Sequence, residues 1–314
     1  MPRRLPHWCI FFAANVWLAK WVADHQQGFV LCRGCIGAPR SRCRCVRSSL
    51  VKKEQSMPAP AEAGSLLLSV PASTLPLPIA QSYFHKAVVL ILGHGQDFTK
   101  GVILNRPTRF TAECFESSLP SVTNASDWHV WFGGACQSID SVEVDIFCLH
   151  MVDSLGGISK RVADGVFVID FSQAQTLVAS GAACASDFFL FAGYCGWSRE
   201  QFRQELDRQD IWILAQNVKP RSVLQDLPRP FPGAAPYPVS DGIACWRRLF
   251  ESQGPDFKEY CRGLDMAFDD NVADERLHRL ISDRLVPASR LERAPREDLP
   301  WLPFTVRLSE WFPF

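Results

Sequence analysis

The stretch from residue 193 to residue 206, GYCGWSREQFRQEL, constrains the fold of this chain more than any other part of it. It follows an apolar run, and the order predicts a buried strand, a glycine turn and the start of a helix. Ser198 is a good N-cap and Gln201 lies three residues on, which is the spacing of a capping box. Trp197 and Phe202 have the spacing of a hydrophobic staple. Every prominent side chain of the stretch therefore has an architectural explanation.

The body of the chain alternates between apolar runs typical of strands and amphipathic runs typical of helices. Strands are predicted at residues 65–70, 87–92, 102–105, 129–132, 144–149, 166–169, 188–191 and 211–215. Helices are predicted at residues 111–117, 173–179, 199–208 and 271–285. Ser172 and Gln175 suggest a second capping box, and Gly181 a helix stop. We expect an α/β fold: one domain with a mixed, mostly buried β-sheet packed by helices, plus a C-terminal helical extension.

Charge is divided unevenly along the chain. Residues 1–63 carry ten Lys or Arg against three Asp or Glu, a net charge of +7, and residues 64–314 carry a net charge of −7. An acidic body argues against broad nucleic-acid binding, because neutralising phosphates needs a basic face. A body of roughly 190–250 residues suits one domain with a well-developed core.

Residues 1–63 are predicted to be a targeting presequence that ends in a flexible linker. Arg3 and Arg4 precede the apolar stretch Trp8–Leu18, and residues 32–53 are basic and nearly free of acid. The order resembles the bipartite presequence of algae with complex plastids, and a mitochondrial transit peptide is the alternative. The apolar stretch is too short to predict a membrane span, so we expect no membrane segment in the mature protein.

The cysteines do not predict a metal site or a disulfide framework. Cys32 and Cys35, followed by Cys43 and Cys45, could be read as a zinc knuckle, but the second pair has only one intervening residue. Seven other cysteines are scattered in apolar surroundings and are interpreted as reduced, buried thiols. The chain contains no hydrolase elbow, phosphate loop, dinucleotide fingerprint or HExxH, and we expect no cofactor.

Six landmarks in order resemble the AlgH/YqgE family. They are Gly64–Pro71, Phe84–His94, Gly101–Pro107, Trp131–Gly134, Gly193–Trp197 and Ile211–Trp212. The resemblance implies a family domain at residues 64–253 that closes with a helix at residues 244–250. It does not reach the C-terminal end, where the residues themselves predict a helix and an aromatic arm packed on the domain at residues 254–314. This chain departs from the family pattern with Ala135-Cys136 where a proline is usual, with Gly93 where an acid is usual, and with Cys195 where a small residue is common. Some family members carry a transcriptional-regulator label.

We interpret the protein as a non-catalytic binding or regulatory protein. A shallow cleft is expected to hold a small ligand or a protein partner. The candidate binding residues are His94, Asn105, Arg106, Gly133, Gly134, Asp187, Tyr194 and Trp197. The alternative is an enzyme that uses Cys195 or His94, in which Cys195 would lie in a turn before a helix N-terminus that stabilises its thiolate. A metal site between His94 and His150 has no ligand spacing to support it.

Overall fold

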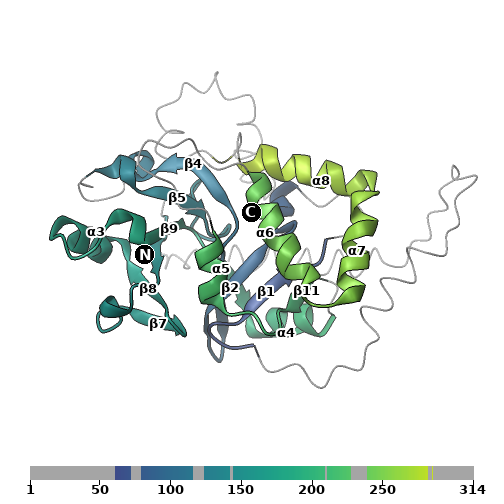
Figure 1. Ribbon diagram of the computed structural model, residues 1–314, viewed down its shortest axis with the longest axis horizontal. Coiled ribbons are helices and arrows are strands. Elements are labelled where there is room, and N and C mark those ends of the chain that lie inside the picture. Colours follow the sequence, from purple (N-terminus) through teal and green to yellow (C-terminus); the bar gives the residue numbers. More distant parts are fainter. Residues whose placement is uncertain are drawn as a thin grey trace, which may run out of the picture. The chain divides into compact units, whose positions relative to one another are not determined.

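The computed structural model describes residues 61–71, 79–115, 124–141, 144–208, 211–227, 239–281 and 285 (Figure 1). Three predicted segments lie outside these residues: most of the presequence, the proline-rich stretch around residues 228–238, and the aromatic arm at residues 301–314. No helix in the described ranges is both long enough and apolar enough to cross a bilayer.

The first sheet is antiparallel throughout and joins strands that are far apart in the sequence. Its order is β10 (Cys195–Ser198), β3 (Phe98–Ile103), β2 (Val88–His94), β1 (Leu66–Ser69) and β11 (Trp212–Leu214). β10 pairs with β3 so that Cys195 lies opposite Gly101. The segment expected to be only a turn between strand and helix therefore contains an edge strand of its own.

The second sheet is mixed and contains one parallel pair. Its order is β4 (Pro107–Thr111), β5 (His129–Phe132), β9 (Phe188–Ala192), β6 (Ile146–His150), β8 (Val166–Asp170) and β7 (Lys160–Ala163). β5 and β9 are the parallel neighbours, and the other pairs are antiparallel. All five residues of β9 are buried, as expected for a continuously apolar strand in the middle of a covered sheet.

Helices and short 3-10 turns connect and cover the sheets. The α-helices are α3 (Phe171–Ala179), α4 (Arg199–Arg208), α5 (Pro220–Asp226), α6 (Val239–Glu251), α7 (Pro255–Asp265) and α8 (Phe268–Arg279). The 3-10 turns are η2 (Ile79–Phe84), η3 (Ala112–Phe115), η4 (Ala125–Asp127), η5 (Asp153–Leu155) and η6 (Ala185–Asp187). α6, α7 and α8 contact one another, α6 also contacts β1, and α8 contacts η2 (Figure 1).

The core has two apolar clusters because the strands of the first sheet bury both of their faces. Leu67 and Val89 belong to one cluster with Phe202 of α4 and Leu277 of α8. The alternating side chains of the same strands belong to the other cluster, which α5, α6 and α7 complete. A strand that alternates between two buried faces reads as a continuous apolar run, and this explains the unbroken hydrophobic stretches of β1 and β2.

The predicted α/β class is confirmed, with the strands distributed over two sheets. β3 ends at Ile103, and the chain then passes through Asn105 and Arg106 into β4 of the second sheet. Periodicity cannot reveal such a change of sheet, since it indicates which side chains of a strand are buried and not which strands pair.

Three local predictions need correction. The expected helix at residues 111–117 is instead the end of β4 followed by η3. Ser172 is not a cap, because β8 runs directly into α3 and Asp170 takes the N-cap position. α5 and α7 were not predicted as helices, although each has a proline in its first turn, which is a helix-start signal. Gly181 follows α3 with φ +76°, as predicted for a helix stop.

Candidate functional site

The tryptophan and glutamine of the 193–206 stretch point into a hydrogen-bond network centred on Glu205. Oε2 of Glu205 accepts from the indole nitrogens of Trp197 at 3.0 Å and Trp212 at 2.8 Å. Oε1 accepts from the side-chain amide of Gln201 at 2.8 Å. Both tryptophans are buried, and the Trp197 ring lies 5.6 Å from that of Phe202, as the predicted staple requires. Ser198 accepts from the backbone amide of Gln201 at 3.3 Å, so this half of the predicted capping box is present.

Gly133 and Gly134 lie where the two sheets meet, against the backbone of Gly193 and Tyr194. A Cβ on Gly133 would overlap the carbonyl oxygen of Gly193, and one on Gly134 would overlap the backbone of Tyr194. The amide of Gly133 donates to Ala192 at 2.9 Å, and its carbonyl accepts from the amide of β3's last residue at 2.8 Å. Glycine is required at this junction for close approach of two backbones, and the Gly133 amide is engaged within the fold.

Cys195 does not have the environment expected of a nucleophile. Its thiol is buried in β10 and lies 3.6 Å from the carbonyl oxygen of Gly133, to which it donates. Burial raises the pKa of this thiol well above its ordinary value. The expected stabilised thiolate is therefore wrong: β10 separates Cys195 from the start of α4, and the surrounding core disfavours the charged form.

A partly exposed polar group lies beside this glycine junction, and we call it the Lys100 group: Lys100, Cys136, Asp145 and Tyr194. Nζ of Lys100 lies 2.6 Å from Oδ2 of Asp145 and 4.2 Å from the centre of the Tyr194 ring. Side-chain exposure is 35% for Lys100 and 29% for Asp145. Backbone hydrogen bonds in both directions hold Cys136 opposite Tyr194. The group therefore joins a cation, an anion and an aromatic ring on a fixed backbone.

Two members of the Lys100 group, Cys136 and Tyr194, have a raised pKa that favours their neutral forms. Burial raises the pKa of the Cys136 thiol, although a hydrogen bond from the amide of Gly196 and the charge of Lys100 act in the opposite direction. Burial, together with Cys136 and Asp145, raises the pKa of Tyr194. At neutral pH Tyr194 is thus a neutral phenol whose ring faces the ammonium of Lys100, which is a cation–π arrangement.

Asn105 and Arg106 are fully buried and bind backbone groups. Oδ1 of Asn105 accepts from the amide of Val88 at 2.8 Å, and Nδ2 donates to the carbonyls of Lys86 and Gly242 at 2.9 and 2.7 Å. The guanidinium of Arg106 donates to three backbone carbonyls, those of Tyr83, His85 and Asn105. Burial lowers the pKa of Arg106 to about 9, so it remains cationic at neutral pH.

The three remaining polar candidates have separate local partners. His94 is exposed at the end of β2, where Nδ1 lies 2.8 Å from Oγ1 of Thr99. Asp187 accepts from the backbone amide of Cys184 and closes η6. His150 is in the other sheet from His94, and both of its ring nitrogens have protein partners. Burial lowers the pKa of His150, which favours the neutral ring.

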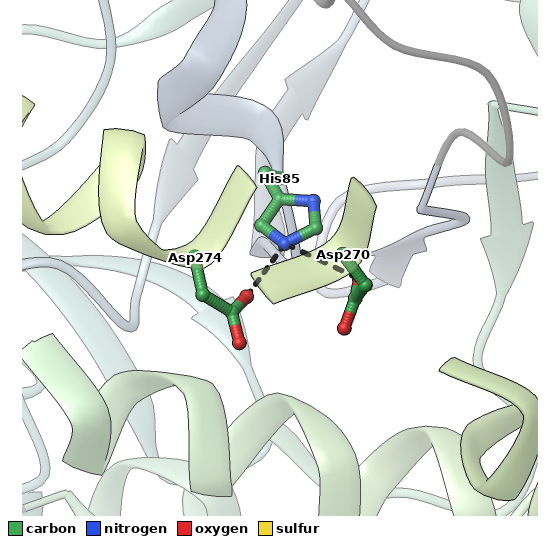
Figure 2. Close-up of side chains that lie close together, drawn as sticks. All are labelled: His85, Asp270 and Asp274. Atoms are coloured by element: carbon green, nitrogen blue, oxygen red, sulfur yellow. Dashed lines mark hydrogen bonds and ion pairs between the residues drawn. The ribbon is translucent and has the colours of Figure 1, made fainter. Parts of the chain in front are cut away.

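Sequence reasoning missed a charged cluster, which we call the α8 charge cluster: buried His85, Lys86 and Asp270 with half-buried Asp274. Nζ of Lys86 lies 2.8 Å from Oδ2 of Asp270 and 2.7 Å from Oδ1 of Asp274. Nε2 of His85 lies 2.7 Å from the same Asp274 oxygen and 3.6 Å from Asp270 (Figure 2). The available signals were a His-Lys pair directly before an apolar strand and two aspartates spaced i,i+4, one just before the helix predicted at residues 271–285 and one within it.

The α8 charge cluster is better described as an ion-pair site than as a metal site. One imidazole nitrogen and two carboxylates lie close enough to hold a metal ion. However, the ammonium of Lys86 is within 2.8 Å of both carboxylates and already supplies the positive charge that a metal would bring. Although burial favours the neutral acid, hydrogen bonds from His85 and Lys86 hold the pKa of Asp274 below its ordinary value.

One small cavity lies between β5, η6 and β9. Its volume is about 20 Å³, which is enough for roughly one water molecule. Asp127, His129 and Ser186 are its polar lining residues. It is too small for a metabolite.

Among the predicted site residues, the structure brings together Gly133, Gly134 and Tyr194, and it adds Lys100, Cys136 and Asp145 to them. Trp197 belongs to the Glu205 network, and Asn105 and Arg106 form a buried backbone anchor. A partly exposed group is therefore found at the glycine junction, where sequence reasoning identified only the tyrosine and the glycines.

Comparison with known proteins identifies the family. The family model described as AlgH-like matches residues 74–257, more than half of the chain, and the chain belongs to that family. A UPF0301 protein of Streptomyces coelicolor is 29% identical over 177 residues, which are 54% of this chain and 80% of that protein. A UPF0301 protein of Cereibacter sphaeroides is 27% identical over 160 residues, which are 49% of this chain and 78% of that protein.

Two solved structures are also similar. The solution structure of the AlgH protein from Pseudomonas aeruginosa has a TM-score of 0.43 and 16% identity, covering 63% of this chain and 93% of that protein. A crystal structure of a Corynebacterium diphtheriae protein has a TM-score of 0.41 and 19% identity, covering 64% and 92%.

Proposed function

We propose that this AlgH-like protein is a non-catalytic binding or regulatory protein, and that it recognises a small ligand or a protein partner at the Lys100 group. The observation that carries the proposal is the pairing of Lys100 with Asp145 over the Tyr194 ring, partly exposed and fixed to a rigid junction of two sheets. Tyrosine presents a large contact area with few rotatable bonds, and a neighbouring ion pair adds orientation.

The remaining motif residues favour binding over catalysis, because their reactive atoms form hydrogen bonds within the folded chain. The carboxylate of Glu205 is satisfied by three donors, and Cys195 is buried as a thiol. A catalytic base and a nucleophile need to lie within hydrogen-bond reach of one another. In the described residues, His94 is paired with Thr99, and the thiol of Cys195 with a backbone carbonyl.

The proposal is tested by a thermal-shift screen of the full chain against metabolites, nucleotides and short peptides. A true ligand at 100 times its dissociation constant stabilises by about 2.7 kcal/mol, which raises Tm by roughly 5–10 °C for a domain of this size. The shift is expected to vanish in Tyr194→Ala and Lys100→Met. It is expected to persist in Lys160→Met, a matched control on the exposed edge strand β7.

Mass spectrometry of every stabilising compound after incubation separates the two classes of function. Recovery of the unchanged compound supports a binding protein. Conversion of a compound by the wild type, lost in His94→Ala, would establish the enzyme alternative and end the present proposal. For a protein partner, a photo-crosslinking amino acid at position 194 is expected to give an adduct in cells that the same label at position 160 does not give.

We further propose that residues 1–63 direct the protein to a plastid. The support is the order of the segment, two arginines and an apolar stretch followed by a basic, acid-poor run. A fluorescent protein placed behind residues 1–63 is expected to accumulate in the plastid of an alga with complex plastids. Accumulation in mitochondria would establish the alternative.

A further inference from the structure

Two buried cationic side chains lie just before strands: Lys86 before β2 and Arg106 before β4. Lys86 and Arg106 are 1% and 0% exposed. The guanidinium of Arg106 donates to the backbone carbonyl of His85, and His85 directly precedes Lys86 in the chain. The backbone of Lys86 has φ 54°, which is uncommon for residues other than glycine and asparagine. The turn before β2 therefore carries one buried cation, Lys86, and is hydrogen-bonded to a second, Arg106.

The negative charge that balances them comes from α8. In the described ranges, the carboxylates within ion-pair distance of Lys86 are those of Asp270 and Asp274, both on α8. Asp265 of α7 also lies near Lys86, but its carboxylate is held by the guanidinium of Arg247 at 3.0 Å. The AlgH-like match ends at residue 257, before α8 begins. The buried cations thus belong to the family domain, and their counter-ions to the segment that follows it.

We propose that His85 and Lys86 form an anion-binding site which the carboxylates of Asp270 and Asp274 occupy in this structure, and for which a doubly charged anion competes with α8. Figure 2 shows the arrangement: both carboxylates extend from α8 toward Nε2 of His85. The site goes beyond the function proposed for the Lys100 group and uses none of its residues.

Charge and geometry define the ligand class. Among the described residues, displacement of α8 removes both carboxylates from ion-pair distance of Lys86, and Arg106 loses the nearby charge of Asp274. Nε2 of His85 is a further donor. Asp270 and Asp274 are spaced i,i+4, so their side chains leave the same face of α8. Hydrogen phosphate and a short dicarboxylate such as succinate share the required double charge and compact acceptor set.

α8 is held by more than charge. Ala273, Leu277 and Ile281 are buried, so displacement of α8 by an anion also exposes apolar surface. Competition in the wild type is therefore expected to need a high anion concentration. A variant with alanine in place of both aspartates isolates the anion site from this cost, because it removes their charge and vacates the space beside Lys86 while the apolar contacts of α8 remain.

The test compares Asp270→Ala/Asp274→Ala with the same variant carrying Lys86→Met, each in the full chain. Tm is measured with increasing inorganic phosphate or succinate at constant ionic strength. For the double variant, we expect a saturable rise of about 3–6 °C at ten times the dissociation constant. The triple variant lacks the ammonium and reports the non-specific effect of a kosmotropic anion. The anion that acts at the lower concentration identifies the ligand class.

Equal Tm shifts in the double and triple variants, or no shift in either, would overturn the proposal. If the double variant does not fold, Asp274→Ala is compared with and without Lys86→Met; Asp270 still pairs with Lys86 there, so a smaller Tm shift is expected. In the wild type, hydrogen exchange provides a second readout. Amides of α8 are expected to exchange faster in 100 mM phosphate than in chloride of equal ionic strength, and unchanged exchange would count against competition.

Discussion

Trp197 donates its indole hydrogen to Oε2 of Glu205, eight residues further along the chain, and the same oxygen accepts from Trp212. A single carboxylate thereby joins an edge strand, the helix that follows it and the opposite edge strand of the same sheet. The spacing of tryptophan, glutamine and glutamate in this stretch is explained by this network.

Replacement of Glu205 by leucine is expected to lower the free energy of unfolding by about 2–4 kcal/mol, since two buried indole N–H groups lose their acceptor. Glu205→Gln is expected to cost less than about 1 kcal/mol, because its amide can still accept from the indoles. Urea unfolding monitored by tryptophan fluorescence measures both. Glu200→Leu is the control, as that exposed carboxylate on the same helix pairs only on the surface. Equal losses in the two leucine variants would contradict the network.

Gly133→Ala is expected to lower the free energy of unfolding by about 3–5 kcal/mol or to prevent folding, because the added Cβ meets backbone that cannot move aside. Gly263→Ala in α7 is the matched control. Its Cβ would meet nothing within 4 Å, and removing a helical glycine is expected to add about 0.5 kcal/mol. Thermal unfolding of the two variants checks the contrast. A Gly133→Ala protein as stable as the wild type would show that the junction is loosely packed.

Asp274→Asn is expected to destabilise the protein at pH 7 by about 1–3 kcal/mol, because hydrogen bonds from Lys86 and His85 to a charged acceptor are weakened. The pKa of Asp274 is lower in the folded protein than its ordinary value of 3.8. Its contribution is therefore complete well above pH 3.8 and is lost as pH falls through the lower, folded pKa. Urea unfolding of wild type and variant from pH 7 to pH 3 is expected to show their difference shrinking below about pH 4. A difference that stays constant over this range would show that the charge of Asp274 contributes nothing.

Alkylation by iodoacetamide is expected to label Cys184 fastest, Cys136 more slowly, and Cys195 only after unfolding. The order follows exposure, since these thiols are exposed, half-buried and buried, and burial raises the pKa of Cys195. Peptide mapping by mass spectrometry after timed labelling gives the three rates. Labelling of native Cys195 as fast as Cys184 would restore it as a candidate nucleophile.

The sequence by itself determined the α/β class, most of the strands, the staple before α4 and the family. These depend on local patterns: apolar runs, helix caps and residue spacing, each of which acts within a few neighbours along the chain. The sequence also identified Tyr194 and the glycine pair as candidate binding residues, because both lie in landmarks that resemble the family.

Only the tertiary structure decided how these patterns combine. It placed β3 and β4 in different sheets and buried Cys195 in the core. It also brought the indole nitrogens of two tryptophans within hydrogen-bond distance of one carboxylate. It also paired Lys86 with aspartates 184 and 188 residues away along the chain. Hydrogen bonds and ion pairs act over a few ångströms in space, so no periodicity of the chain can reveal which distant residues will meet.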